Sequence, residues 1–281
     1  MLFPHARMGA MPLTKRFHLV VSLLVVAALL CGPGAAAPAV GLEARQDPGQ
    51  SDDPILLQRL GILYLQENQP REAIRALEQA SALMPENGDT HMWLGFAYFL
   101  NQQFDEAEES YVRALLHNPD LTDAHNFLGL LHAEQGNTQK ALNEFQIALA
   151  DPAYPPVSRM RVHYNIGKLY FETEEYDLAL ASLQQAVELA RNPADPTYGL
   201  VYLILGKVLR QIGRTEEAVI ALERVLEGGN QNAEAHLELG LAYRDQGDFF
   251  NAREHLSQVV QLAPGSPFSE RARAALAQIP G

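Results

Sequence analysis

Cysteine is almost absent from this chain of 281 residues, in which Cys31 is the only one. A single cysteine cannot form a disulfide within the chain, so the fold must be stabilised without such cross-links. The scarcity sets no limit on the compartment, because a lone thiol is compatible with both oxidising and reducing surroundings.

Positive charge is also scarce. The sequence has 21 lysines and arginines against 34 aspartates and glutamates, which gives a formal net charge of −13. Nucleic-acid binding needs a basic surface that neutralises phosphates, and adhesion to anionic lipid needs the same. The charge balance therefore argues against both functions.

Enzyme motifs are missing as well. The sequence contains no nucleophile elbow, P-loop, dinucleotide-binding glycine fingerprint or zincin helix. We therefore expect a protein that is not an enzyme, with no catalytic residue and no cofactor.

Long hydrophobic runs are limited to one near the start of the chain. Leu19 to Cys31 is apolar except for Ser22, and it follows Lys15 and Arg16. The run is shorter than the roughly 20 residues of a membrane-spanning helix and fits the core of a signal peptide. We predict an export signal over residues 1–31 and, after it, a flexible Ala-, Gly- and Pro-rich linker over residues 32–53.

The end of this run leaves two outcomes open. Cys31 is placed as in a bacterial lipoprotein signal, which it resembles and which implies lipidation of the cysteine, although Leu30 stands where a small residue is usual. The alternative is cleavage after Ala39, which would remove the cysteine. In either case we expect an exported protein in the periplasm, and with lipidation one anchored to the outer membrane.

A repeated pair of small residues organises the rest of the chain. Six glycines are spaced 34, 34, 38, 39 and 34 residues apart, and an alanine follows each glycine by twelve residues. A glycine inside a helix costs about 1 kcal/mol relative to alanine, which is tolerable where two helices must approach closely. The glycines are Gly61, Gly95, Gly129, Gly167, Gly206 and Gly240, and the alanines are Ala73, Ala107, Ala141, Ala179, Ala218 and Ala252.

This period and pattern resemble the tetratricopeptide repeat. The resemblance implies an all-α, right-handed solenoid of six helix pairs, hence twelve repeat helices and no strands, over residues 54–265. The six repeats are expected at 54–87, 88–121, 122–155, 160–195, 199–232 and 233–265. Residues 266–281, with an apolar face along a short helix, are expected to cap the last repeat.

Four histidines occupy one position of the repeat, four residues before the glycine. They are His91, His125, His163 and His236. Because residues of successive repeats form a ladder and need not converge on one ion, we expect them to be structural and predict no metal site.

The resemblance also implies a partner-binding groove lined by the first helix of each pair. Its positions place apolar residues in the second repeat and cations in the fourth and fifth: Met92, Phe96, Phe99 and Leu100, then Arg161, Tyr164, Lys168, Lys207 and Arg210. Such a groove fits a protein segment with an apolar part followed by an acidic part. Several apolar members could instead pack between neighbouring first helices, as we consider for Ile62 and Leu130. The oligomeric state is left open.

The whole arrangement resembles the type IV pilus biogenesis lipoproteins, a pilotin-like family. Six repeats, a signal ending at cysteine, a spacer and a cap are shared features, as is the Pro- and Tyr-containing connection at residues 151–156 followed by Asn165. The resemblance implies an outer-membrane-anchored protein that helps a secretin subunit to reach the membrane and to form its ring. The alternative is a generic exported adaptor for another envelope complex.

Overall fold

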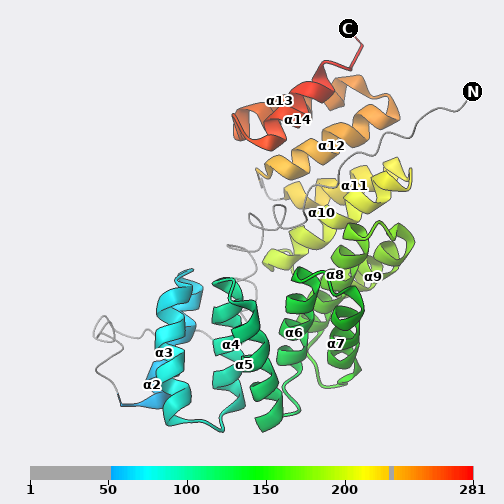
Figure 1. Ribbon diagram of the computed structural model, residues 1–281. Helices are drawn as coiled ribbons and strands as arrows, with labels where there is room; N and C mark the ends of the chain where they lie inside the picture. Colours follow the sequence, from blue (N-terminus) through cyan, green and yellow to red (C-terminus); the bar gives the residue numbers. More distant parts are fainter. Residues whose placement is uncertain (1–51, 228–230, 281) are drawn as a thin grey trace, which may run out of the picture.

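The computed structural model describes residues 52–227 and 231–280, which form thirteen helices and no strand (Figure 1). The expected signal segment, Cys31 and nearly all of the linker lie outside the described residues. Within them, no helix is both long and apolar enough to cross a membrane. The prediction of an all-α repeat solenoid is confirmed.

The helices follow one another as six antiparallel pairs and a final single helix, stacked side by side (Figure 1). The first helices of the pairs are α2 (Pro54–Gln66), α4 (Gly88–Leu100), α6 (Thr122–Glu134), α8 (Pro156–Glu172), α10 (Pro196–Gln211) and α12 (Ala233–Gln246). The second helices are α3 (Pro70–Leu83), α5 (Phe104–His117), α7 (Thr138–Ala150), α9 (Tyr176–Leu189), α11 (Thr215–Leu226) and α13 (Phe249–Leu262). The cap is α14 (Pro267–Leu276).

Local sequence explains where many of these helices begin. Asp53, Asn87 and Asn232 each accept hydrogen bonds from backbone N–H groups of the first helical turn, which would otherwise have no partner. Proline opens α2, α3, α8, α10 and α14, where its missing N–H costs nothing.

The six glycines of the frame lie where the two helices of each pair come closest. A Cβ atom added to Gly61 would lie 2.4 Å from Cγ of Leu77, and one added to Gly129 would lie 2.6 Å from a ring carbon of Phe145. Four residues before each such contact on the second helix comes the frame alanine, fully buried in all six pairs. The close approach that the sequence predicts is therefore present in every pair.

The turn inside each pair also has a fixed geometry. The residue seven positions after the frame glycine has a positive φ in all six repeats, and it is Asn68, Gln102, Gly136, Glu174, Gly213 or Gly247. Glycine adopts this left-handed backbone without a steric penalty, whereas Gln102 and Glu174 do so at a cost.

Two first helices start earlier than the sequence predicts. The repeat boundaries expected at 160 and 199 fall inside first helices, because α8 begins at Pro156 and α10 at Pro196. The extra residues of the 38- and 39-residue spacings therefore extend the first helix at its N-terminal end and lengthen the connection before it.

The connection between α7 and α8 folds back onto the start of α6. Buried Tyr154 donates a hydrogen bond from its hydroxyl to Asp123 at 2.6 Å, and Thr122 donates to Asp151 at 2.6 Å. Arg159 of α8 donates to the backbone carbonyls of Leu149 and Asp151 at the end of α7. These bonds join the third and fourth repeats where the regular spacing is interrupted.

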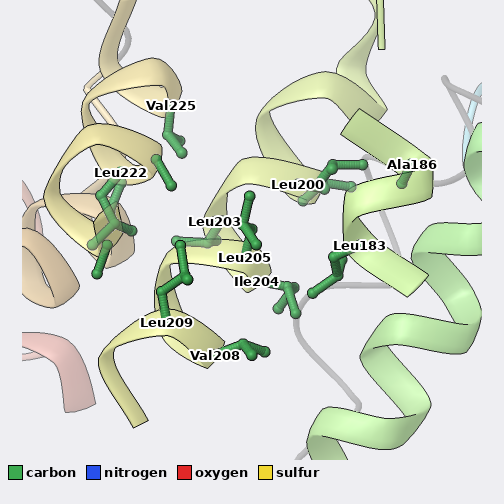
Figure 2. Packing of buried hydrophobic residues seen from close by; sticks show 14 of the residues in the cluster. Leu183, Ala186, Leu200, Leu203, Ile204, Leu205, Val208, Leu209, Leu222 and Val225 are labelled. Carbon is green, nitrogen blue, oxygen red and sulfur yellow. The ribbon is translucent and has the colours of Figure 1, made fainter. Parts of the chain in front are cut away.

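The apolar core runs along the array in connected sections. One section packs α2 to α6, another joins α7 to α8, and a third, formed mainly by α8 to α12, is shown in part in Figure 2. In the third section Leu183 of α9, Leu203 and Ile204 of α10, and Leu222 of α11 fill the space between three successive helices. Stacking of neighbours, rather than one central core, holds the array together.

Tyr111 is one of the buried side chains that have a polar atom without a hydrogen-bond partner among the described residues. Tyr111 is fully buried against Gly95, and its hydroxyl has no hydrogen-bond partner among the described residues. Burial raises the pKa of Tyr111 well above its ordinary value. Phe145 occupies the equivalent place one repeat later, which shows that the site accepts a ring without a hydroxyl.

We therefore expect Tyr111→Phe to stabilise the protein by about 1 kcal/mol, because it removes a buried unpaired hydroxyl at little change in shape. Urea unfolding followed by circular dichroism measures the change. Tyr98→Phe is the matched control: the Tyr98 hydroxyl donates to Glu78 at 2.6 Å, so its loss should lower stability. A destabilised Tyr111→Phe variant would contradict the assignment.

Candidate partner-binding face

The candidate site is the surface formed by the first helices α2, α4, α6, α8, α10 and α12, which we call the first-helix face. Within each first helix the frame glycine points at the second helix. Residues one and five positions after the glycine, and six before it, lie roughly a third of a turn round the helix from it. These residues point towards neighbouring first helices or the open side of the array, so they are the candidates for contact with a partner.

The aromatic residues predicted to line the groove in the second repeat are instead part of the core. Phe96 is 1% exposed and stacks on Phe127 of α6, with ring centroids 4.9 Å apart. Phe99 and Met92 are buried in the same section of the core. The prediction that these three side chains are free for a ligand is wrong, because they fill the space between neighbouring first helices. Phe127, which was not among the predicted groove residues, completes this packing.

Part of the predicted apolar surface does stay accessible. Leu100 of α4 is half-buried, as are Ile62 of α2 and Leu130 of α6, which lie one position after their frame glycines. Ile55, at the start of α2, is 44% exposed. These four residues form the apolar part of the first-helix face over the first three repeats.

The cations predicted for the fifth repeat are bound to acidic residues of the sixth. Lys207 Nζ lies 2.7 Å from a carboxylate oxygen of Glu234, and also 5.5 Å from the ring centroid of Phe171. Arg210 donates through Nη2 and Nε to one oxygen of Glu238, at 2.9 and 3.2 Å, and through Nη1 to Asp245 at 3.3 Å. The prediction that Lys207 and Arg210 are free to hold an acidic segment is therefore corrected, since α12 already supplies the acids.

The cations predicted for the fourth repeat also lie next to acidic residues of this chain. Arg161 is buried, and its Nη2 lies 3.7 Å from a carboxylate oxygen of Asp195, the residue that caps α10. Lys168 pairs with Glu172 of its own helix at 3.7 Å. Tyr164 is buried in the core. The predicted cationic half of the groove is thus a set of bridges within the solenoid, and a partner carboxylate would have to compete with these acids.

Glu238 is the polar residue that the sequence analysis overlooked. Its side chain is 2% exposed and lies between Arg210 of α10 and Arg271 of α14, which donates at 3.2 Å. It therefore links the fifth repeat, the sixth repeat and the cap. Two features of the sequence could have identified Glu238 as the partner of Arg210. It is an acidic residue two positions before Gly240, and it follows Arg210 by 28 residues.

Neutral hydrogen bonds connect the other first helices. Gln58 of α2 donates to Thr90 of α4 at 3.0 Å, and Asn165 of α8 donates to Asn126 of α6 at 3.1 Å. Asn126 is almost fully buried. Asn165, which precedes Gly167, is thus half of an amide pair between α8 and α6 in which Asn126 is the buried member.

Three of the four repeated histidines make side-chain contacts, which lie within the same repeat for His125 and His236 and reach the end of the preceding repeat for His91. His91 Nε2 lies 2.8 Å from the carbonyl oxygen of Pro85, and His125 Nδ1 lies 2.7 Å from a carboxylate oxygen of Glu144. His236 pairs with His255. Over residues 52–227 and 231–280, no three or more His, Cys, Asp or Glu side chains gather in a way that could hold a metal ion.

Comparison with known families agrees with this architecture. Three family models, each described as a tetratricopeptide repeat, match residues 64–131, 158–230 and 203–267. Together they cover parts of all six helix pairs.

Three individual proteins illustrate the range of similar chains. PilF of Pseudomonas aeruginosa is 24% identical with a TM-score of 0.67, and the match covers 79% of this chain and 97% of that one. PilW, described as a widely conserved type IV pilus biogenesis factor, is 21% identical with a TM-score of 0.68, over 80% of this chain and 99% of that one. The anaphase-promoting complex subunit CDC16 of Saccharomyces cerevisiae is 27% identical over 72% of this chain, which spans 24% of the length of CDC16. At these identities the structural likeness to PilF and PilW shows the fold alone.

Proposed function

Because the chain belongs to the tetratricopeptide repeat family of protein-binding scaffolds, we propose that it acts in type IV pilus assembly as a pilotin-like factor. In this proposal it is exported to the periplasm and held at the outer membrane by a lipid on Cys31. There it supports the localisation of a secretin subunit and the formation of its ring. It acts by recognition, without chemistry of its own.

One observation carries this proposal. The six-repeat array of this chain corresponds to nearly the whole of PilF and PilW, 97% and 99% of their lengths, whereas it corresponds to 24% of CDC16. A match over nearly the whole length of those proteins supports a shared role more than the repeat pattern does, because that pattern is common to proteins of many functions. The alternative, a periplasmic adaptor for another envelope complex, rests on the family alone.

The surface that we assign to the partner is the apolar part of the first-helix face. Leu100, Ile62 and Leu130 are half-buried on adjacent first helices, and Ile55 is exposed beside them. A partner segment lying across α2, α4 and α6 would contact all four. Apolar residues at the centre of such an interface contribute most of the binding energy, and charges at the rim chiefly alter the association rate.

We expect Ile55→Asp combined with Leu100→Asp to reduce binding of a detergent-solubilised secretin subunit by at least about tenfold, which corresponds to 1.4 kcal/mol. Secretin in the cells should then remain monomeric, and surface pili should be absent. The matched control is Leu116→Asp with Ile220→Asp, the same kind of substitution at exposed positions of α5 and α11. Circular dichroism checks that both variants stay helical.

Two outcomes separate the proposals. Normal secretin rings in cells that lack this protein altogether would refute the pilus role and leave the adaptor alternative standing. Rings lost on deletion but kept in the Ile55→Asp, Leu100→Asp variant would retain the pilus role and place the partner on another surface.

A further inference from the structure

The sixth repeat contains a pair of histidines in direct contact. Nδ1 of His236 on α12 lies 2.9 Å from Nδ1 of His255 on α13, and the two rings are stacked with centroids 5.2 Å apart. A hydrogen bond between two imidazole nitrogens needs one donor and one acceptor. The contact therefore requires that at least one of the two rings be neutral, and it is lost when both carry a proton.

We propose that this pair is an acid-sensitive latch, which holds α12 to α13 at neutral pH and releases the last repeat when both histidines are protonated. Two adjacent imidazolium rings repel each other and cannot share a proton. Histidine is the side chain whose unperturbed pKa places its change of charge between pH 5 and 8, so it is the residue type best suited to respond to acid under physiological conditions.

The surroundings of the pair place it between packed helices. Tyr243 of α12 stacks on the ring of His255 with centroids 5.6 Å apart, and its hydroxyl donates to Glu223 of α11 at 3.0 Å. Burial, followed by this bond, raises the pKa of Tyr243 to about 12, so the tyrosine is neutral across the relevant range. Both histidines are half-buried, so a repulsion between their rings would act where α12 and α13 are in contact.

Burial and the nearby carboxylates shift the pKa values of the histidines in opposite directions. Burial lowers the pKa of His236 from 6.5, and proximity to His255 lowers it further. Burial also lowers the pKa of His255, although the carboxylates of Glu223 and Glu254 oppose that shift. The groups that α10 and α14 direct towards α12 are Lys207, Arg210 and Arg271, and they are bound to Glu234 and Glu238.

The sign of the pH dependence follows from these directions. A histidine whose pKa is lowered in the folded state binds fewer protons there than in the unfolded state. Stability of the sixth repeat is therefore full above about pH 6.5, the ordinary histidine value. It falls as the pH drops below that value. Since α12 also carries Glu234 and Glu238, release of α12 would weaken their bonds to Lys207 and Arg210 on the first-helix face.

The third repeat provides an internal comparison. His125 occupies the same repeat position as His236, and its partner 19 residues later is Glu144, where the sixth repeat has His255. In the third repeat the group facing the histidine is a carboxylate, whereas in the sixth it is a second imidazole, so only the sixth repeat holds two rings that repel each other when both are protonated. A repulsion between rings in acid is therefore expected in the sixth repeat and not in the third.

Amide hydrogen exchange of the whole chain, corrected for intrinsic rates, tests the latch. Between pH 7.5 and 5.5 we expect protection of α12, α13 and α14 to fall by about tenfold, which corresponds to about 1.4 kcal/mol. Protection of α6 and α7 should not fall. His255→Gln, which keeps a hydrogen-bonding side chain but does not titrate, should remove most of the loss. Glu144→His should create a new loss at α6 and α7.

The proposal is overturned if acid lowers protection evenly along the array or if His255→Gln leaves the loss unchanged. It is also overturned if protection is lost first at α8. There His163 has a pKa lowered chiefly by burial, and it would account for the acid response instead. Because the latch lies within one chain, none of these measurements requires the partner.

Discussion

Replacing Gly129 with leucine is expected to destabilise the array by about 3 kcal/mol and to open the third helix pair. A Cβ atom at this position would lie 2.6, 2.7 and 3.1 Å from three carbons of the Phe145 ring, which is itself fully buried. The ring has no free space to enter, so α6 and α7 would have to separate. Urea unfolding and hydrogen exchange at these two helices measure the effect.

The same chain offers a glycine inside a helix that lacks this constraint. Gly199 lies in α10, and a Cβ atom there would have its nearest neighbour 4.0 Å away, in Val225. Gly199→Ala should therefore stabilise the protein by up to about 1 kcal/mol through helix propensity. If Gly129→Leu is as stable as the natural protein, close approach is not the reason for the repeated glycine.

The repeat frame could be read from the sequence because its cause is local and is repeated six times. Gly129 and Ala141 identify two helices in contact, and the spacing between successive glycines counts the pairs. The starts of α8 and α10 could not be read in this way. Pro156 and Pro196 open these helices, but the interrupted spacing left their first turns outside the assigned repeats.

The candidate face was predicted less well, for a physical reason. Positions such as that of Phe96 point towards the neighbouring first helix as well as towards the open side of the array. Which of the two applies depends on the side chain opposite, here Phe127. Likewise, Arg210 alone indicates a binding cation, and Glu238 makes it a structural one. Pairing between repeats is not visible in the residues of one repeat.

The buried carboxylate of Glu238 leads to the second large expected effect. Glu238→Leu should destabilise the protein by about 3 kcal/mol, because removing one partner leaves a buried charge uncompensated. Arg210 would keep a single bond to Asp245 at 3.3 Å, and its side chain is only 15% exposed. The loss should be greatest at α10, α12 and α14, which meet at this residue, and hydrogen exchange can locate it.

A double substitution distinguishes the stability that the ion pair between Glu238 and Arg210 contributes from the cost of leaving one of its two charges buried and unpaired. Replacing a buried ion pair with apolar residues of similar volume is often neutral or stabilising. Glu238→Leu with Arg210→Met should therefore recover most of the stability that Glu238→Leu alone loses. Arg214→Ala serves as the control, because it breaks a solvent-exposed contact with Glu217 and should have little effect on stability. If the double variant is as unstable as the sum of its two single substitutions, Glu238 acts by some means other than neutralising Arg210. In that case the bridge between the fifth and sixth repeats does not arise from charge.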